Sequence, residues 1–171
     1  MKGPRSLTIA IFFSKIGLMI DINYWLLKSE PSSYSFDTLK KENETIWDGV
    51  RNYQARNLMR NMSIGDKAFF YHSNCKIPGI VGIVEIIAKD IIDPTQFDKN
   101  SKYYDPKSDN NFPRWDCVRV KYIRSFERII SLNELKNDFS SEEFKLVKKG
   151  NRLSVIDVPE KIAKIILSKV D

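Results

Sequence analysis

The eleven residues from Trp47 to Asn57 concentrate side chains that can hold a flat, polar ring. They include two arginines, two asparagines, a glutamine and two aromatic residues around one glycine. Asparagine and glutamine donate and accept hydrogen bonds at the same time, and arginine offers a planar fork of donors. Next to the faces of a tryptophan and a tyrosine, these groups are suited to binding a nucleobase.

Within this stretch, Arg51 and Asn52 follow Gly49 at the predicted start of a helix. The free N–H groups and the dipole of a helix N-terminus favour an anion, such as a phosphate or the carbonyl edge of a base. An alternative stays open, in which Asn52 only caps the helix and Arg51 only pairs with Asp48. Trp47 taken alone is more typical of a hydrophobic core than of a stacking surface.

Two predicted strand ends carry further polar groups. Lys28, Ser29 and Glu30 end the first strand before a proline that fixes the direction of the chain. Such residues commonly line the mouth of a pocket, but the segment taken alone is more typical of an ordinary turn. His72 ends another strand, just before a serine and an asparagine. Its side chain can contact a ligand or exchange a proton near neutral pH. Alternatively, a neighbouring backbone group can form its hydrogen bond.

The standard signatures of catalysis are missing from the sequence. No residue is spaced to form a triad with His72, Ser73 lacks the glycines of a nucleophile elbow, and there is no phosphate loop or GxGxxG. The two cysteines, Cys75 and Cys117, are far apart, and the chain has one histidine. This set predicts neither a zinc site nor a disulfide framework. We therefore expect no catalytic residue, no metal and no cofactor.

Length and charge set broad limits. A chain of 171 residues is sufficient for one domain with a substantial core. The formal charge of +6 and the pI of about 9.2 favour an anionic partner such as nucleic acid. However, Lys2, Arg5 and Lys15 lie in the first 18 residues, which contain no acid, so residues 19–171 carry only +3. Charge alone is therefore weak support for a nucleic-acid partner.

The first twenty residues are interpreted separately. Their basic start and the apolar run Leu7–Phe13 are similar to the beginning of a signal peptide. Lys15 interrupts the run, no small-residue cleavage site follows, and the run is much shorter than the roughly 20 residues that span a bilayer. We expect translation to start at Met19, the upstream residues being an artefact of start-codon assignment or a disordered extension. The prediction is an extension over residues 1–20, one domain over residues 21–171, a cytoplasmic location and no membrane partner.

The remaining sequence predicts strands separated by short helices. Start signals predict five helices, which begin at or just after Ser35, Asn52, Ser131, Ser140 and Pro159. Strands are expected over residues 22–28, 67–72, 79–88, 115–124 and 153–156, with an ordered excursion over residues 90–114. Because this order lacks regular βαβ alternation, it predicts an α+β fold with a barrel-like sheet.

Five segments, taken together and in order, closely resemble the EVE domain family. They are Tyr24–Pro31, Trp47–Asn57, Phe69–Asn74, Pro78–Gly82 and Asn151–Val155. Residues 93–98 and 103–107 look like the connecting excursion of the same family. The resemblance runs from about Asn23 to Leu167, which is nearly the whole chain, and several multi-residue matches in one order make it specific.

The resemblance implies a PUA-like fold, in which short helices surround a twisted, barrel-like β-sheet, related to the YTH and ASCH domains. It also implies a pocket for a modified base in DNA or RNA, such as 5-methylcytosine or its oxidised derivatives. Carried over residue by residue, the implied pocket consists of Lys28, Ser29, Glu30, Trp47, Arg51, Asn52, Tyr53, His72, Ser73 and Asn74, closed by Arg152, Leu153 and Ser154.

The main hypothesis is therefore a module that binds nucleic acid by accepting a flipped, modified base. In it, Trp47, Tyr53 or Trp25 would stack on the base, Asn52, Ser29 and His72 would hydrogen-bond its edge, and Arg51 and Lys28 would hold phosphate. One alternative is an enzyme acting on modified nucleic acid or nucleotides, with His72 and Glu30 as acid and base. Another is a protein-interaction module without a small ligand. We expect a monomer, while the base modification and the choice between DNA and RNA stay open.

Overall fold

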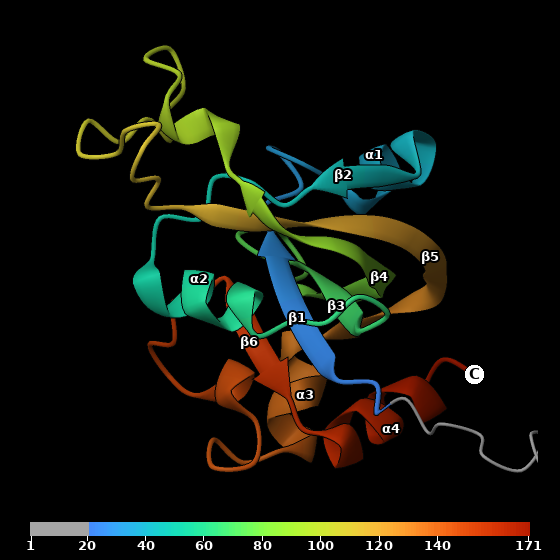
Figure 1. Ribbon diagram of the computed structural model, residues 1–171. Coiled ribbons are helices and arrows are strands. Elements are labelled where there is room, and N and C mark those ends of the chain that lie inside the picture. Colours follow the sequence, from blue (N-terminus) through green and yellow to red (C-terminus); the bar gives the residue numbers. More distant parts are fainter. Residues whose placement is uncertain (1–20) are drawn as a thin grey trace, which may run out of the picture.

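The computed structural model describes residues 21–171, so the predictions for residues 1–20 lie outside the described residues (Figure 1). The predicted α+β class is confirmed, with short helices around one six-stranded mixed sheet. The strands are β1 (Tyr24–Ser29), β2 (Glu44–Ile46), β3 (Lys67–His72), β4 (Gly79–Ile92), β5 (Asp116–Ser131) and β6 (Val155–Val158). The helices are α1 (Phe36–Glu42), α2 (Tyr53–Arg60), α3 (Leu132–Asp138) and α4 (Glu160–Ser168), with 3₁₀ turns η1 (Pro94–Gln96) and η2 (Lys145–Val147). Within residues 21–171, no helix has the length and apolar character that a bilayer crossing requires.

The strands follow the order β2-β5-β4-β3-β1-β6. The neighbours β1 and β3 are parallel, whereas the other pairs are antiparallel. The described sheet has β2 and β6 at its edges, so it bends like a barrel without closing into one. The parallel pair matters for the site, because the carboxyl ends of β1 and β3 reach the same edge of the sheet.

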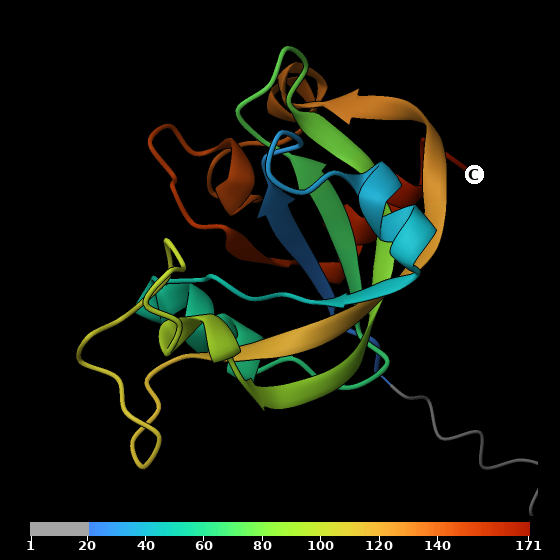
Figure 2. The same ribbon diagram turned by 90° about the horizontal axis from the view of Figure 1, so that it is seen from above.

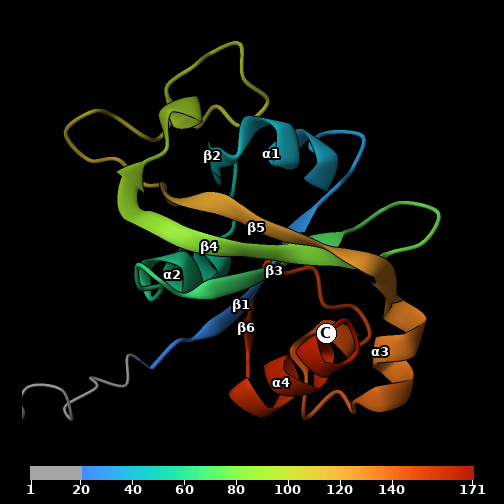
Figure 3. The same cartoon turned by 90° about the vertical axis from the view of Figure 1, so that its right-hand side faces the viewer.

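Two strands are longer than the sequence predicts. The strand β4 continues to Ile92 rather than ending near Ala88, and β5 continues to Ser131 rather than ending near Arg124. Their pairing shifts register at four places. Each bulge interrupts the alternation of side chains between the two faces, so the sequence shows no continuous two-residue period along the whole strand. Each bulge also bends the strand. The pair therefore curves across the molecule (Figure 3).

Hydrophobic residues cover both faces of the sheet. Successive side chains of a strand point to opposite faces, so Trp25 and Leu27 enter one core cluster and Leu26 enters the other. The first cluster includes residues of α1 and α2, and the second includes residues of α3 and α4. Figure 3 shows α3 and α4 on one side of β4 and β5, with α1 on the other.

Three predicted helix starts are confirmed by their side-chain caps. The Ser35 hydroxyl accepts a hydrogen bond from the Thr38 N–H at 3.1 Å, and the Asn52 side-chain oxygen accepts one from the Ala55 N–H at 3.0 Å. The Ser131 hydroxyl caps α3 in the same way. These contacts join residues three positions apart, so the sequence alone contains the information that specifies them.

The helix predicted after Ser140 is wrong. The expected reciprocal bonds are present, because the Ser140 N–H donates to Glu143 at 2.9 Å and the Glu143 N–H donates to the Ser140 hydroxyl at 3.3 Å. The chain nevertheless forms a turn and then η2. Phe144 adopts an extended backbone (φ −138°) and is fully buried in the second cluster. Burial of this ring outweighs the local helix signal.

The last strand, β6, lies two residues further along the chain than predicted. Its pairing with β1 begins where Val155 meets Leu27 and continues to Val158, next to Tyr24. The residues just before Val155 belong to the loop that reaches the functional site described below.

The predicted excursion is ordered, as expected. Gln96 is completely buried and joins its two ends. Its amide nitrogen donates to the carbonyl oxygens of Asp93 (2.7 Å) and Trp115 (2.8 Å), while its amide oxygen accepts from the N–H groups of Arg114 (3.0 Å) and Trp115 (3.1 Å). The excursion lies beside the connection between β2 and α2 (Figure 2).

Candidate functional site

A cavity of about 760 Å³ lies at the carboxyl ends of β1 and β3. The turn before α1, the connection from β2 to α2, the excursion and the loop before β6 complete its walls. A volume of this size is typical of pockets that bind small organic ligands. Its lining consists of Lys28, Ser29, Glu30, Ser33, Tyr34, Glu42, Thr45, Ile46, Trp47, Asp48, Gly49, Val50, Arg51, Ser73, Lys102, Tyr103, Arg152 and Ser154.

The structure brings most of the predicted site residues to this cavity. The predicted residues in its lining are Lys28, Ser29, Glu30, Trp47, Arg51, Ser73, Arg152 and Ser154. The predicted residues that do not line it are Asn52, Tyr53, His72, Asn74 and Leu153. The sequence motifs therefore locate the cavity, whereas the direction of each side chain depends on the fold.

The part of the cavity lining at the end of β1 contains cationic, hydroxyl and acidic groups, from Lys28, Ser29 and Glu30. The Ser29 hydroxyl donates to the Tyr34 carbonyl oxygen at 2.6 Å, and the Lys28 N–H donates to the Ser154 carbonyl oxygen at 2.9 Å. Both bonds fasten loops to the end of β1. The Lys28 side chain is half-buried, and burial lowers its pKa. Within residues 21–171, neither Lys28 nor Arg152 forms an ion pair, so these two cations of the lining are available to an anionic group.

The aromatic surface of the cavity comes partly from residues that the sequence analysis missed. Trp47 is only 8 % exposed and packs edge-on against Phe70, so the core alternative holds for most of its ring. Tyr34 and Tyr103 are half-buried in the lining. The Tyr34 hydroxyl donates to Glu42 at 2.6 Å. Burial, and then this hydrogen bond, raise the pKa of Tyr34 to about 12.

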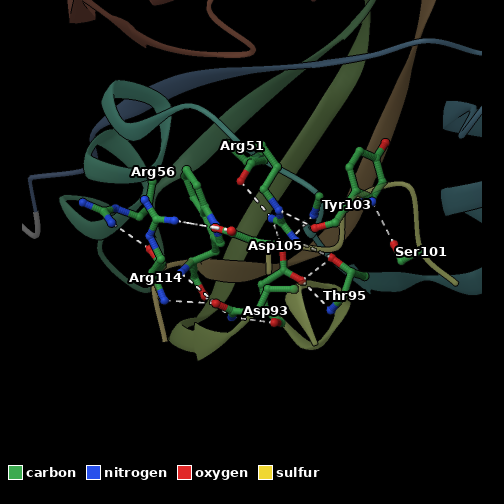
Figure 4. A network of polar contacts seen from close by, with 12 residues as sticks. Arg51, Arg56, Asp93, Thr95, Ser101, Tyr103, Asp105 and Arg114 are labelled. Carbon is green, nitrogen blue, oxygen red and sulfur yellow. Dashed lines mark hydrogen bonds and ion pairs between the residues drawn. The ribbon is translucent and has the colours of Figure 1, made fainter. Parts of the chain in front are cut away.

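The guanidinium of Arg51 is held by the excursion (Figure 4). It donates to Asp93 and Thr95 at 2.8 Å each and to the Tyr103 carbonyl oxygen at 2.7 Å. Its ion-pair partner is Asp93, which is 1 % exposed, rather than Asp48 as the sequence alternative suggested. Burial disfavours ionised Asp93, but the hydrogen bonds from Arg51 and Thr95 hold its pKa below the ordinary value. Arg51 therefore builds the cavity wall, and few of its donors remain for the phosphate that the sequence analysis assigned to it.

Gly49 allows Tyr103 to form part of that wall. Its φ is +76°, and a Cβ placed there would lie 2.6 Å from the Tyr103 ring. Its N–H donates to Asp93 at 2.8 Å, so the same carboxylate fixes Gly49 and Arg51. The neighbouring Asp48 faces the cavity, where partial burial and then the charge of Asp93 raise its pKa.

His72 is satisfied by the backbone. Its Nε2 accepts a hydrogen bond from the Phe36 N–H at 3.1 Å, and its ring packs edge-on against Phe70. Burial lowers the pKa of His72, while the charge of Asp37 opposes that shift. His72 lines a separate, smaller groove, and Glu30 lines the main cavity. The two side chains are thus not arranged as the acid–base pair of the enzyme hypothesis.

The other side chains outside the cavity have structural positions. Asn52 caps α2, Asn74 has a left-handed backbone (φ 50°) in the loop after β3, and Leu153 packs against both core clusters. Tyr53 lies on the outer surface of α2, where its ring stacks on Trp115 with centroids 4.8 Å apart. Nothing within four residues of Tyr53 in the sequence could indicate this partner.

Trp25, the third predicted stacking residue, is also outside the cavity lining. It is 7 % exposed, and its indole N–H donates to Asp66 at 2.8 Å. Asp66 is itself 2 % exposed, so this bond belongs to the core. Of the three aromatic residues proposed to stack on a base, only Trp47 reaches the cavity.

Comparison with known proteins identifies relatives of this arrangement. The EVE domain matches residues 23–169. Thymocyte nuclear protein 1 of Rattus norvegicus is 50 % identical over 125 residues, which cover 67 % of this chain and 55 % of the relative. The human protein of that name is 48 % identical over 126 residues, covering 67 % and 56 %. The chain thus spans about half the length of these curated relatives.

Solved structures share the fold along most of this chain. A Pseudomonas syringae protein is 41 % identical, with a TM-score of 0.83 over 86 % of this chain and 99 % of its own. The human THYN1 protein, crystallised with DNA containing 5-methylcytosine, is 39 % identical, with a TM-score of 0.79 over 87 % and 98 %. A YTH domain from Zygosaccharomyces rouxii is 18 % identical, with a TM-score of 0.52 over 88 % and 85 %, a likeness of fold alone.

The expected PUA-like fold is confirmed by these neighbours. The family match covers almost every residue that the structure describes, from before β1 to the end of α4. Four of the five segments that resemble the family also contribute residues to the cavity lining, and only Pro78–Gly82 does not. On these grounds the chain belongs to the EVE domain family.

Proposed function

We propose that this chain is a binding module that accepts a flipped, modified nucleobase, such as 5-methylcytosine, in the cavity at the ends of β1 and β3. The observation that carries the proposal is the cavity itself, which combines aromatic, apolar and cationic walls. The fold of this chain is shared by the human THYN1 protein, whose structure contains DNA with 5-methylcytosine. Most of the residues that build the walls come from the motifs on which the family resemblance rests, and Tyr34 and Ile46 are among those that do not.

The walls supply the interactions that a flipped nucleotide requires. Removing a base from its stack costs a few kcal/mol, and stacking on an aromatic side chain returns about 1–3 kcal/mol. Tyr34 and Tyr103 provide half-buried rings for this purpose. Lys28, which forms no ion pair within the described residues, is the cation placed to attract a phosphate. Asp48 offers a carboxyl group to the polar edge of the base.

A methyl group is distinguished by apolar contact. Ile46 and Val50 line the cavity beside Trp47 and provide such surface. One extra methyl or methylene in an apolar pocket is worth about 1–3 kcal/mol, which corresponds to a preference of about 10- to 200-fold. We therefore expect selectivity of this order for a methylated over an unmethylated cytosine.

Titration of an oligonucleotide panel tests the proposal. The panel contains single- and double-stranded DNA and RNA of one sequence, with cytosine, 5-methylcytosine or 5-hydroxymethylcytosine at one position. The expected result is tightest binding to a modified member, with the preference retained as salt is raised. Weak and equal binding to every member, governed only by salt, would contradict a base-accepting cavity.

A pair of neighbouring tyrosines provides a matched test of the cavity. Tyr103 lines it, whereas Tyr104 is 36 % exposed and does not. We expect Tyr103→Ala to weaken binding of the modified oligonucleotide by about 5- to 150-fold, the effect of one lost base–aromatic stack. Tyr104→Ala should bind like the wild type. Equal effects of the two substitutions would mean that the cavity is not where the base binds.

Several expectations from the sequence stay predictions. Binding to RNA, a monomeric state, the absence of catalysis and a cytoplasmic location belong to the proposal rather than to the findings. The RNA members of the panel address the first of these, because the 2′-hydroxyl is the group that lets a protein distinguish RNA from DNA.

A further inference from the structure

A second cluster of aromatic and cationic side chains lies outside the cavity. We call it the arginine–tyrosine cluster, which consists of Tyr53, Arg56 and Arg60 of α2 with Arg114 and Trp115 at the end of the excursion. Trp115 is 5 % exposed and forms its base, whereas Tyr53 is 46 % exposed. The two rings stack with an interplanar angle of 18°. Tyr53 is thus an exposed aromatic platform supported by a buried ring.

Two guanidinium groups hold this platform in place. Those of Arg56 and Arg114 lie 4.7 Å and 5.5 Å from the centre of the Tyr53 ring, and Arg114 also donates to the Tyr53 hydroxyl. Arg56 donates to the Arg114 carbonyl oxygen at 2.7 Å, and Arg114 pairs with Asp105 at 3.0 Å. The platform is therefore ordered before any ligand arrives, which lowers the entropic cost of binding.

The cluster has an excess of positive charge. Arg60 pairs with Asp116 and Arg114 pairs with Asp105, but Arg56 makes no ion pair within residues 21–171. Burial, and then the charge of Arg60, lower the pKa of Arg56. An anion next to Arg56 would relieve this repulsion. An exposed aromatic ring beside guanidinium groups is the combination that binds single nucleic-acid strands through base stacking and phosphate contacts.

The cluster adjoins the cavity. The Arg51 guanidinium lies 5.4 Å from the centre of the Trp115 ring and 5.8 Å from the centre of the Tyr103 ring. Tyr103 lines the cavity, so one guanidinium separates the two sites. Figure 4 shows Arg56 and Arg114 on one side of Arg51 and Tyr103 on the other. A strand with one nucleotide in the cavity can therefore continue over the cluster.

We propose that the arginine–tyrosine cluster binds the nucleic-acid strand next to the nucleotide held in the cavity, with Tyr53 stacking on a neighbouring base and Arg56 and Arg60 contacting phosphates. This inference rests on the proposed function, because it assumes a nucleic acid in the cavity. Stacking tolerates any base, so the cluster contributes affinity and the cavity contributes selectivity.

The test compares a mononucleotide, whose base is 5-methylcytosine or cytosine, with a nine-nucleotide single strand that carries the same base at its centre. Tyr53→Ala should weaken binding of the nine-nucleotide strand by roughly 5- to 150-fold, the cost of one lost base–aromatic stack. Binding of the mononucleotide and the ratio between modified and unmodified ligands should not change. Arg56→Gln should reduce the dependence of log affinity on log salt by about 0.7 for the lost phosphate contact.

Arg128→Gln is the matched control, since it removes the same charge from an exposed arginine. Arg128 pairs with Glu134 and lines the smaller groove beside His72, so its substitution should leave strand binding unchanged. Thermal unfolding of every variant separates binding from stability. Arg56→Gln provides a second test if Tyr53→Ala destabilises the fold, because Arg56 forms no ion pair that its loss would break.

The possible results separate the two proposals. If Tyr53→Ala and Arg56→Gln bind the long strand like the wild type, the cluster only fastens the excursion to α2 and the inference is overturned. A change in the ratio of modified to unmodified binding would also overturn it, because Tyr53 would then act on the cavity. If the wild type lacks any modified-base preference, but the length and salt effects appear, the cavity function fails and the cluster remains a strand-binding surface.

Discussion

Polar side chains that look alike in the sequence have different surroundings in the fold. Lys28 and Asp48 face the cavity, where burial shifts the pKa of each toward its neutral form. Arg51 and His72 instead give their polar atoms to protein partners. The charged forms of Lys28 and Asp48 are therefore disfavoured in the free protein, and both side chains have few interactions with other residues. Both are available to bind a ligand.

The shifted pKa of His72, the single histidine, predicts that the free energy of unfolding depends on pH. Because the folded state lowers the pKa of His72 from its ordinary 6.5, the unfolded chain takes up the proton more readily. The contribution of His72 to stability is complete above pH 6.5 and is lost as the pH falls below it. Urea unfolding at pH 7.5, 6.5 and 5.5 should show this decrease. In His72→Gln, it should be smaller at the same pH values, and equal pH slopes in the two proteins would contradict the assignment.

At the scale of elements, what the sequence predicts depends on the distance between partners. The caps of α1, α2 and α3 join residues three positions apart and are predictable. The pair of Arg51 with Asp93 spans 42 residues, and the stack of Tyr53 on Trp115 spans 62. The motifs thus indicate which segments build the site, but neither the missed Tyr103 nor the outward direction of Tyr53 follows from spacing alone.

The connection between β2 and α2 depends on Gly49, and a second glycine provides its control. Gly49 and Gly150 have φ values of +76° and +79°, but a Cβ on Gly150 would meet nothing within 4 Å. Alanine at either position should cost about 1–2 kcal/mol of backbone strain. Gly49→Ala should cost more and should also weaken base binding, because it displaces Tyr103. Urea unfolding measures the difference, and equal losses would mean that the Tyr103 ring relaxes freely.

At the scale of the whole molecule, net charge and selectivity come from different parts of the chain. Half of the formal charge of +6 lies in the first 18 residues. The cavity and the arginine–tyrosine cluster lie between Lys28 and Ser154. Non-specific attraction to a polyanion should therefore be separable from recognition of a base.

A chain that begins at Met19 carries +3 and tests this separation. It should bind all oligonucleotides more weakly than the full chain at low salt, and the two proteins should converge as salt screens the charges. The ratio of modified to unmodified binding should be the same in both. A changed ratio in fluorescence titrations would show that the first 18 residues take part in recognition.

The buried amide of Gln96 has a consequence for how such a protein can diverge. Gln96 forms hydrogen bonds to both ends of the excursion. These bonds close off the segment that carries Tyr103 from the strands β4 and β5 that it connects. Closing a loop costs only about 0.6 kcal/mol more for each doubling of its length. Insertions into the excursion after Gln96 should therefore cost the fold little stability. Natural selection can change one wall of the cavity, and with it the ligand that is admitted, while the sheet is inherited unaltered.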